Sequence, residues 1–209
     1  EKIKSNFSKE IENLFHKENK FSPENFCNLL KEYLIGLPFN LYNEDILSSI
    51  IFYSVLDINN NDSNKEREKI KIFAYDKILK DKIENTYLNT KIDMILINGD
   101  KLFIFGFSSI EQNGSQEELK KMKFKRYAER IVNFLKESYY DSEKINLIYE
   151  VGIAYSTNSN QINTSIDYNV IPINSLDLNV YKNSEFVKMI KEIENNKFTK
   201  EEIELHKLI

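Results

Sequence analysis

Two short apolar runs separated by a polar turn constrain the fold of this chain more than any other feature. Residues 92–97 read IDMILI, residues 102–107 read LFIFGF, and Asn98, Gly99 and Asp100 lie near the centre of the gap between them. An Asn-Gly pair between two such runs is typical of a tight β-turn, so we expect an antiparallel hairpin. Because apolar residues occupy both faces of the hairpin, it needs a covering layer on each side. This requirement favours an α/β fold.

Residues 116–138 have the period of an amphipathic helix. At about 100° per residue, one continuous arc holds most of the apolar side chains in this stretch. They are Phe124, Tyr127, Ala128, Ile131, Val132, Phe134 and Leu135. We expect a single long helix packed across the sheet.

Further strands are expected on both sides of these elements. Ile70, Ile72 and Ala74 alternate with charged or bulky residues, and residues 147–154 and 166–173 are apolar runs separated by a polar loop. The order of hairpin, crossover helix and further strands predicts a mixed central β-sheet flanked by helices. Helices are expected at residues 1–58 and 184–209, so that all 209 residues form one domain with its core at 70–173.

Composition excludes several functional classes. A single cysteine, Cys27, excludes a disulfide framework and a cysteine-based zinc cluster. The two histidines, His16 and His206, lie near opposite ends of the sequence, so neither a histidine metal site nor a Ser-His-Asp triad is expected. No run approaches the roughly 18 apolar residues of a membrane span, and no glycine-rich phosphate loop is present. We therefore expect an intracellular protein, cytoplasmic or nuclear, with no membrane or nucleotide partner.

Asp93 is the residue with a mechanistic interpretation. It lies on the first hairpin strand, beside the expected second strand. In metal-dependent phosphodiester cleavage, acidic residues on adjacent strands bind divalent ions, and a nearby lysine supports the attacking water or the developing charge. The structural alternative is an ordinary strand-end aspartate that accepts backbone hydrogen bonds.

Four separated pieces occur in the order of a known family. They are the strand with Asp93, the strand at residues 102–107, the helical segment KRYA at 125–128, and GIA at 152–154. In these pieces the chain resembles the PD-(D/E)XK nuclease superfamily, and more closely the nuclease-like domain appended to AAA-ATPase-like proteins. The resemblance covers about residues 26–173. It implies a restriction-endonuclease-like core.

The resemblance also implies where the catalytic groups would lie. The family's second acidic residue falls on Gly106, its lysine on Ser108 and its helical glutamine on Lys121. Asp93 remains, with Glu44 as a candidate for an extra acid that some members carry on an early helix. Because glycine has no ligand atom, Mg²⁺ held by Asp93 alone would depend on substrate phosphates and water. This predicts a catalytically inactive descendant, without a cofactor, that acts as a binding or structural module in a larger protein or assembly.

A first alternative is an active nuclease with relocated residues. Catalytic residues in this superfamily migrate to neighbouring elements. Lys121, with Glu111 or Glu117, would then restore a DNA or RNA nuclease that uses Mg²⁺ or Mn²⁺. The ordinary interpretation of Lys121 is a helix-edge lysine that keeps its amine in water.

A second alternative is a nucleic-acid-binding module without catalysis. A basic cluster on the long helix would contact phosphates. It comprises Lys120, Lys121, Lys123, Lys125, Arg126 and Arg130, of which Lys120, Lys123, Lys125 and Arg126 are the main candidates. These charges spread around the helix among acidic residues, and the net charge of the chain is −4, so a solvated face is the competing interpretation.

Overall fold

The computed structural model describes five continuous stretches of the chain and a few helical residues before them. The stretches are residues 71–83, 86–109, 114–137, 142–156 and 163–179, and the earlier residues are 25, 28, 29, 49–53, 55 and 56. Most of the predicted N-terminal helices, including Glu44, and all of the predicted C-terminal helices lie outside these residues.

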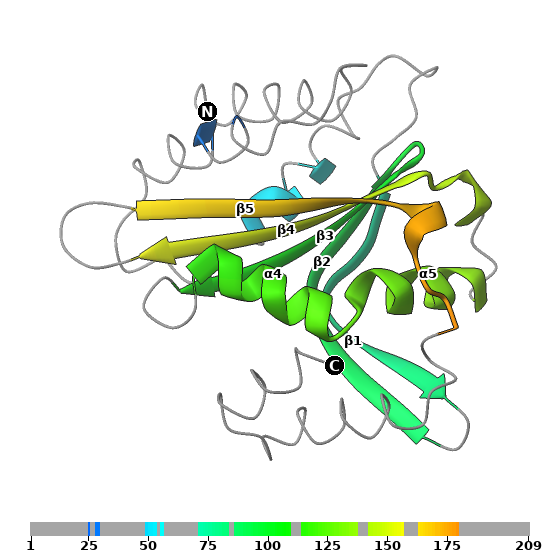
Figure 1. Ribbon diagram of the computed structural model, residues 1–209. Coiled ribbons are helices and arrows are strands. Elements are labelled where there is room, and N and C mark those ends of the chain that lie inside the picture. Colours follow the sequence, from blue (N-terminus) through cyan, green and yellow to red (C-terminus); the bar gives the residue numbers. More distant parts are fainter. Residues whose placement is uncertain are drawn as a thin grey trace.

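A five-stranded mixed sheet forms the centre of the molecule (Figure 1). Its strands are β1 (Lys71–Ile83), β2 (Thr86–Asn98), β3 (Lys101–Ser109), β4 (Leu147–Ser156) and β5 (Asn163–Pro172). Their order in the sheet is the order in the chain, with β3 and β4 parallel and all other neighbours antiparallel. The predicted α/β fold with a mixed central sheet is confirmed.

The central hairpin forms as predicted. Asn98 pairs with Lys101 across a two-residue turn, in which Gly99 has a φ of 57°. This left-handed backbone conformation is readily adopted by glycine. The apolar side chains of both runs are buried on both faces of the sheet.

Strands β1 and β2 are much longer than predicted. The pairing of β2 with β3 extends to Met94 and Phe105, whereas β2 and β1 remain paired as far as Thr86 and Ile83. Their outer halves therefore leave the sheet as a two-stranded ribbon (Figure 1). Residues 75–91 show no regular apolar alternation, so the sequence did not predict this extension.

The predicted single helix at residues 116–138 is wrong in one respect, because it is two helices. α4 (Gly114–Phe124) and α5 (Tyr127–Glu137) are separated by a turn in which Arg126 has a φ of 53°. The Arg126 N–H donates to the carbonyl of Lys123 at 3.1 Å, and the Arg130 N–H donates to that of Arg126 at 3.0 Å. Both helices bury the same side, so the apolar pattern continues across the break.

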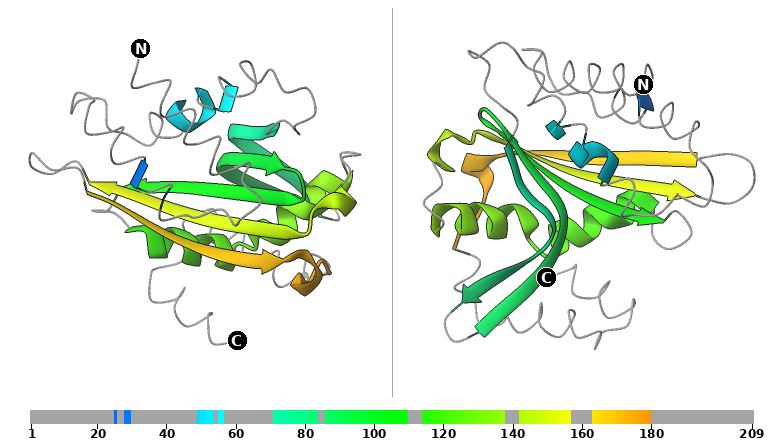
Figure 2. Two further views of the ribbon diagram at one scale, coloured as in Figure 1. Left: turned by 90° about the horizontal axis from the view of Figure 1, so that it is seen from above. Right: turned by 180° about the vertical axis from the view of Figure 1, so that it is seen from behind.

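α4 and α5 lie on one face of the sheet, and the helical residues between 49 and 56 that the structure describes lie on the other (Figure 2). α4 and α5 bury a cluster that includes Leu119, Met122 and Ile131 against one face. Ile51 and Val55, which belong to the helical residues 49–53, 55 and 56, are fully buried, and Figure 2 shows this segment on the side of the sheet away from α4. No helix among the described residues has the length and apolar character needed to cross a membrane.

Candidate functional site

A row of four residues crosses the sheet beneath α4. Gly106 of β3 pairs with Gly152 of β4, which pairs with Asp167 of β5. Asp93 of β2 precedes Met94, the partner of Phe105, so it continues the row beyond Gly106. Two glycines are thus flanked by two aspartates, and the absence of Cβ atoms lets the helix approach the sheet closely.

Glu118 of α4 occupies the space that a side chain at Gly106 would need. A Cβ atom built on Gly106 would lie 2.7 Å from both Cγ and Oε1 of Glu118 and would also collide with the methyl group of Met122. Glu118 and Met122 are one helical turn apart and therefore lie on the same face of α4. Glu118 is only 3% exposed. The Glu118 side chain thus lies directly over Gly106 of β3.

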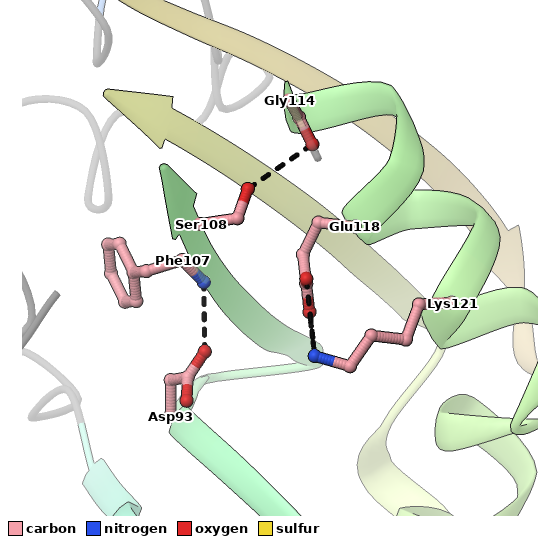
Figure 3. A network of polar contacts seen from close by, with 6 residues as sticks. All are labelled: Asp93, Phe107, Ser108, Gly114, Glu118 and Lys121. Carbon is pink, nitrogen blue, oxygen red and sulfur yellow. Dashed lines mark hydrogen bonds and ion pairs between the residues drawn. The ribbon is translucent and has the colours of Figure 1, made fainter. Parts of the chain in front are cut away.

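Lys121 is the ion-pair partner of Glu118. Its Nζ lies 2.9 Å from Oε1 and 3.2 Å from Oε2 of Glu118, and the lysine side chain is 46% exposed (Figure 3). Burial alone would lower the pKa of Lys121, but the carboxylate of Glu118, with smaller effects of Tyr127 and Asp93, raises that pKa above its usual range. Lys121 is therefore a permanent cation that Asp93 also influences.

Asp93 lies where β2 and β3 separate. Its Oδ2 accepts a hydrogen bond of 2.8 Å from the backbone N–H of Phe107 (Figure 3). The carboxylate thus binds an amide of β3 just beyond Met94 and Phe105, where the β2–β3 ladder ends. This geometry is compatible with both interpretations of Asp93 from the sequence. One is an aspartate that accepts a backbone hydrogen bond, and the other is a residue of a metal site.

Tyr127, the first residue of α5, completes the polar group around Lys121. It is 3% exposed, and burial raises the pKa of its phenol to about 12. The positive charge of Lys121 lowers this pKa, and the negative charge of Glu118 raises it. Asp93 and Arg130 also act on Tyr127 electrostatically. The phenol therefore stays protonated at neutral pH and keeps its O–H donor.

A separate buried acid lies at the break between α4 and α5. Glu150 of β4 is 1% exposed, and burial raises its pKa to about 7. Hydrogen bonds from Asn169 and from the backbone of Ala128, and the positive charge of Lys123, lower this pKa in part. The Asn169 amide donates to Oε2 at 3.5 Å, and the negative charge of Glu129 raises the pKa further. The Glu150 carboxylate thus accepts from the backbone N–H of Ala128, one of the amides that the first turn of α5 leaves without a helical acceptor.

The remaining candidates from the sequence are dispersed. Ser108 lies next to the site, and its hydroxyl donates to the carbonyl of Gly114 at 3.2 Å. Glu117 is half exposed and pairs with Lys120 at 2.6 Å, so it does not reach Gly106. Glu44 and Glu111 lie outside the described residues.

Ion pairs with neighbouring glutamates partly neutralise the predicted basic cluster. Lys120 pairs with Glu117, and Arg126 pairs with Glu129 at 3.1 Å. Arg130 is 2% exposed, so its inclusion among phosphate-contacting residues is wrong. Lys123 is exposed, and Lys125 is partly exposed in the turn between the helices.

Glu118 is the site residue that the sequence analysis missed. In the sequence it is one of the acidic residues that lie among the basic residues of the helix. Its position three residues before Lys121 places both side chains on one helical face, and this spacing was available from the sequence. That this face opposes Gly106 depends on the packing of α4 and could not be derived from the sequence.

The arrangement supplies two carboxylates and one lysine around one point of the sheet. Mg²⁺ is usually bound by one or two carboxylates together with water and substrate phosphates, so Asp93 and Glu118 fit such an ion by donor type. Within the described residues, no group of three or more histidine, cysteine, aspartate or glutamate side chains could hold a metal. Such an ion would therefore require substrate or water to complete its coordination.

No family model, curated protein or solved structure matches this chain.

Proposed function

We propose that this chain is a metal-dependent nuclease domain with a restriction-endonuclease-like core of the PD-(D/E)XK type, whose second carboxylate and lysine come from α4 instead of β3. The observation that carries the proposal is the position of Glu118, whose carboxylate lies 2.7 Å from the site of the missing Cβ of Gly106. Lys121 accompanies it and offers the cation that Ser108 does not. Both groups that the strand lacks are thus provided by one turn of the facing helix.

Each residue has a role that follows from its position. Asp93 and Glu118 would hold the divalent ion, which when bound supplies Lewis-acid activation of the phosphoryl group and of water. Lys121, a permanent cation with its side chain about half exposed, would stabilise negative charge that develops on the phosphoryl oxygens. The N–H of Phe107 fixes the carboxylate of Asp93.

A second candidate function is the inactive binding module that the sequence alone favoured. The observation in its favour is the ion pair of Glu118 with Lys121, because an ammonium group within 2.9 Å already neutralises the buried carboxylate. In that case Glu118 and Lys121 only fill the space above Gly106. The first candidate is preferred because a volume-filling role needs no charge, and burying one has a desolvation cost.

Cleavage assays on DNA and RNA oligonucleotides with Mg²⁺ and Mn²⁺ test the proposal. We expect Asp93→Asn and Glu118→Gln to lower turnover by about 100-fold or more, because each removes a metal ligand. Lys121→Met should lower it by about 100-fold through loss of charge stabilisation.

The same helix provides matched controls for these variants. Glu117→Gln and Lys120→Met alter an exposed pair one residue earlier and should leave turnover unchanged. Absence of divalent-dependent turnover in the unmodified protein, or equal losses in the two pairs of variants, would contradict the nuclease proposal and favour the binding module.

Returning the carboxylate to the strand is a second test. Gly106→Glu alone should fold poorly because its side chain collides with Glu118 and Met122. Combined with Glu118→Ala, it should recover part of the turnover that Glu118→Ala loses. Recovery would show that the two positions share one chemical role, whereas a stable but inactive double variant would count against the relocation.

A further inference from the structure

The position of α4 determines whether Glu118 and Lys121 reach the site at all. Both side chains come from the helix, whereas Asp93 and Gly106 belong to the sheet. A slide or rotation of α4 would move Glu118 away from Gly106. The contacts that fix the first turn of the helix therefore bear directly on the chemistry.

Ser115, the second residue of α4, forms a hydrogen bond with Asp167, which lies at the opposite end of the row from Asp93. Its hydroxyl donates to Oδ2 of Asp167 at 2.7 Å and lies 2.8 Å from the hydroxyl of Ser165. A serine has one proton to donate, so the bond between the two hydroxyls must be donated by Ser165. The chain of bonds runs from Ser165 to Ser115 to Asp167. Ser115 is 3% exposed, so water cannot replace these bonds easily.

Close backbone packing also holds the first turn of α4 against the sheet. A Cβ atom on Gly152 would collide with the carbonyl oxygen of Ser115, so the backbone of α4 rests directly on β4. The hydroxyl of Ser108 donates to the carbonyl of Gly114 at 3.2 Å. The first turn of α4 is thus bound to β3, β4 and β5, and Glu118 follows one turn later on the buried side of the helix.

We propose that Asp167 is a positioning residue for the site: by accepting the hydrogen bond of Ser115, it fixes α4 so that Glu118 and Lys121 lie over Gly106 beside Asp93. This inference rests on the nuclease function proposed above and extends it to a residue that touches neither substrate nor metal. One row of the sheet then carries both a metal ligand, Asp93, and the anchor of the helix that supplies the other ligand.

The test compares three variants with the unmodified protein. Asp167→Ala removes the acceptor, Asp167→Asn keeps an oxygen that can accept from Ser115, and Asp177→Ala is the matched control. Asp177 accepts a local bond from the Asn179 N–H, at 3.0 Å in an exposed turn. Three quantities are measured: the Nζ resonance of Lys121, the Kd for Mn²⁺, and kcat and KM with an oligonucleotide.

We expect Asp167→Ala to shift the Lys121 resonance, to raise the Mn²⁺ Kd by about 10-fold or more, and to lower kcat with little change in KM. Asp167→Asn should restore most of these values, and Asp177→Ala should change none. If Asp167→Ala does not fold, Ser115→Ala removes the donor instead and should have the same effects.

The inference and the proposed function can fail separately. An unchanged Lys121 resonance and Mn²⁺ Kd in folded Asp167→Ala would overturn the positioning role. If the unmodified protein does not bind Mn²⁺, the nuclease proposal fails, and the Lys121 resonance then decides alone whether Asp167 positions the helix. A shift in Asp167→Ala that Asp167→Asn reverses would support the anchor, and no shift would overturn it.

Discussion

Gly106 and Glu118 share one volume, so neither residue can be interpreted without the other. Gly106→Ala should destabilise the protein by about 1–3 kcal/mol, because its Cβ would overpack against Glu118 and Met122. In a Glu118→Ala background the cost should be smaller, since one of the two colliding side chains is gone. Urea denaturation of the single and double variants measures this coupling.

Gly152 provides the control for this comparison of single and double variants. A Cβ there would meet the backbone oxygen of Ser115, which Glu118→Ala leaves in place. Gly152→Ala should therefore cost the same in both backgrounds. Additive effects of Gly106→Ala and Glu118→Ala would show that the two residues do not compete for space.

Glu150 makes stability depend on pH in a defined direction. Its pKa is about 7 in the folded protein, against 4.5 ordinarily, so the folded state holds the extra proton between these values. Stability should therefore fall as pH rises from about 4.5 to 7, by roughly 3 kcal/mol if the whole shift is expressed. Denaturation series at several pH values should show this slope, and Glu150→Gln should flatten it.

An exposed glutamate serves as the reference for this pH effect. Glu143→Gln, in the short helical turn at Ser142–Lys144, should keep the slope of the unmodified protein. An equal slope in Glu150→Gln would assign the pH dependence to other groups.

At the scale of the elements, the break between α4 and α5 depends on one residue with a left-handed backbone. Arg126→Gly and Arg126→Val both lose the ion pair with Glu129, but only valine is strained at a φ of 53°. The valine variant should be less stable than the glycine variant by about 1–2 kcal/mol. Thermal denaturation of the two variants provides the comparison, and equal stability would mean that the turn relaxes.

The sequence predicted those elements whose cause is local. The hairpin around Gly99 has apolar runs and a turn residue that together leave one interpretation, and the strands β4 and β5 follow similar runs. The helix break was missed because the buried side of α4 continues into α5, and because part of the cause is Glu150, which lies 24 residues after Arg126. The β1–β2 ribbon was missed because residues 75–91 show no regular apolar alternation.

At the scale of the whole molecule, the candidate site is a product of packing. Asp93 was identified from its strand, and Lys121 from the position of the helical glutamine in the family that the chain resembles. Their partner Glu118 was not, because the row from Asp93 to Asp167 brings together residues from four strands and α4. Under the proposed nuclease function, Glu118 supplies from α4 the carboxylate that β3 does not carry at Gly106, and these two positions meet only in the packed molecule.

The most direct measurement is a titration of the isotopically labelled protein with Mn²⁺, observed at the backbone amide of Phe107. This amide donates to the carboxylate of Asp93 at 2.8 Å, so a paramagnetic ion held by Asp93 and Glu118 would lie next to it. We predict that its signal disappears at substoichiometric Mn²⁺ in the unmodified protein and in Glu117→Gln, and persists in Glu118→Gln. A Phe107 signal that stays sharp in the unmodified protein at excess Mn²⁺ would contradict a metal site at this position.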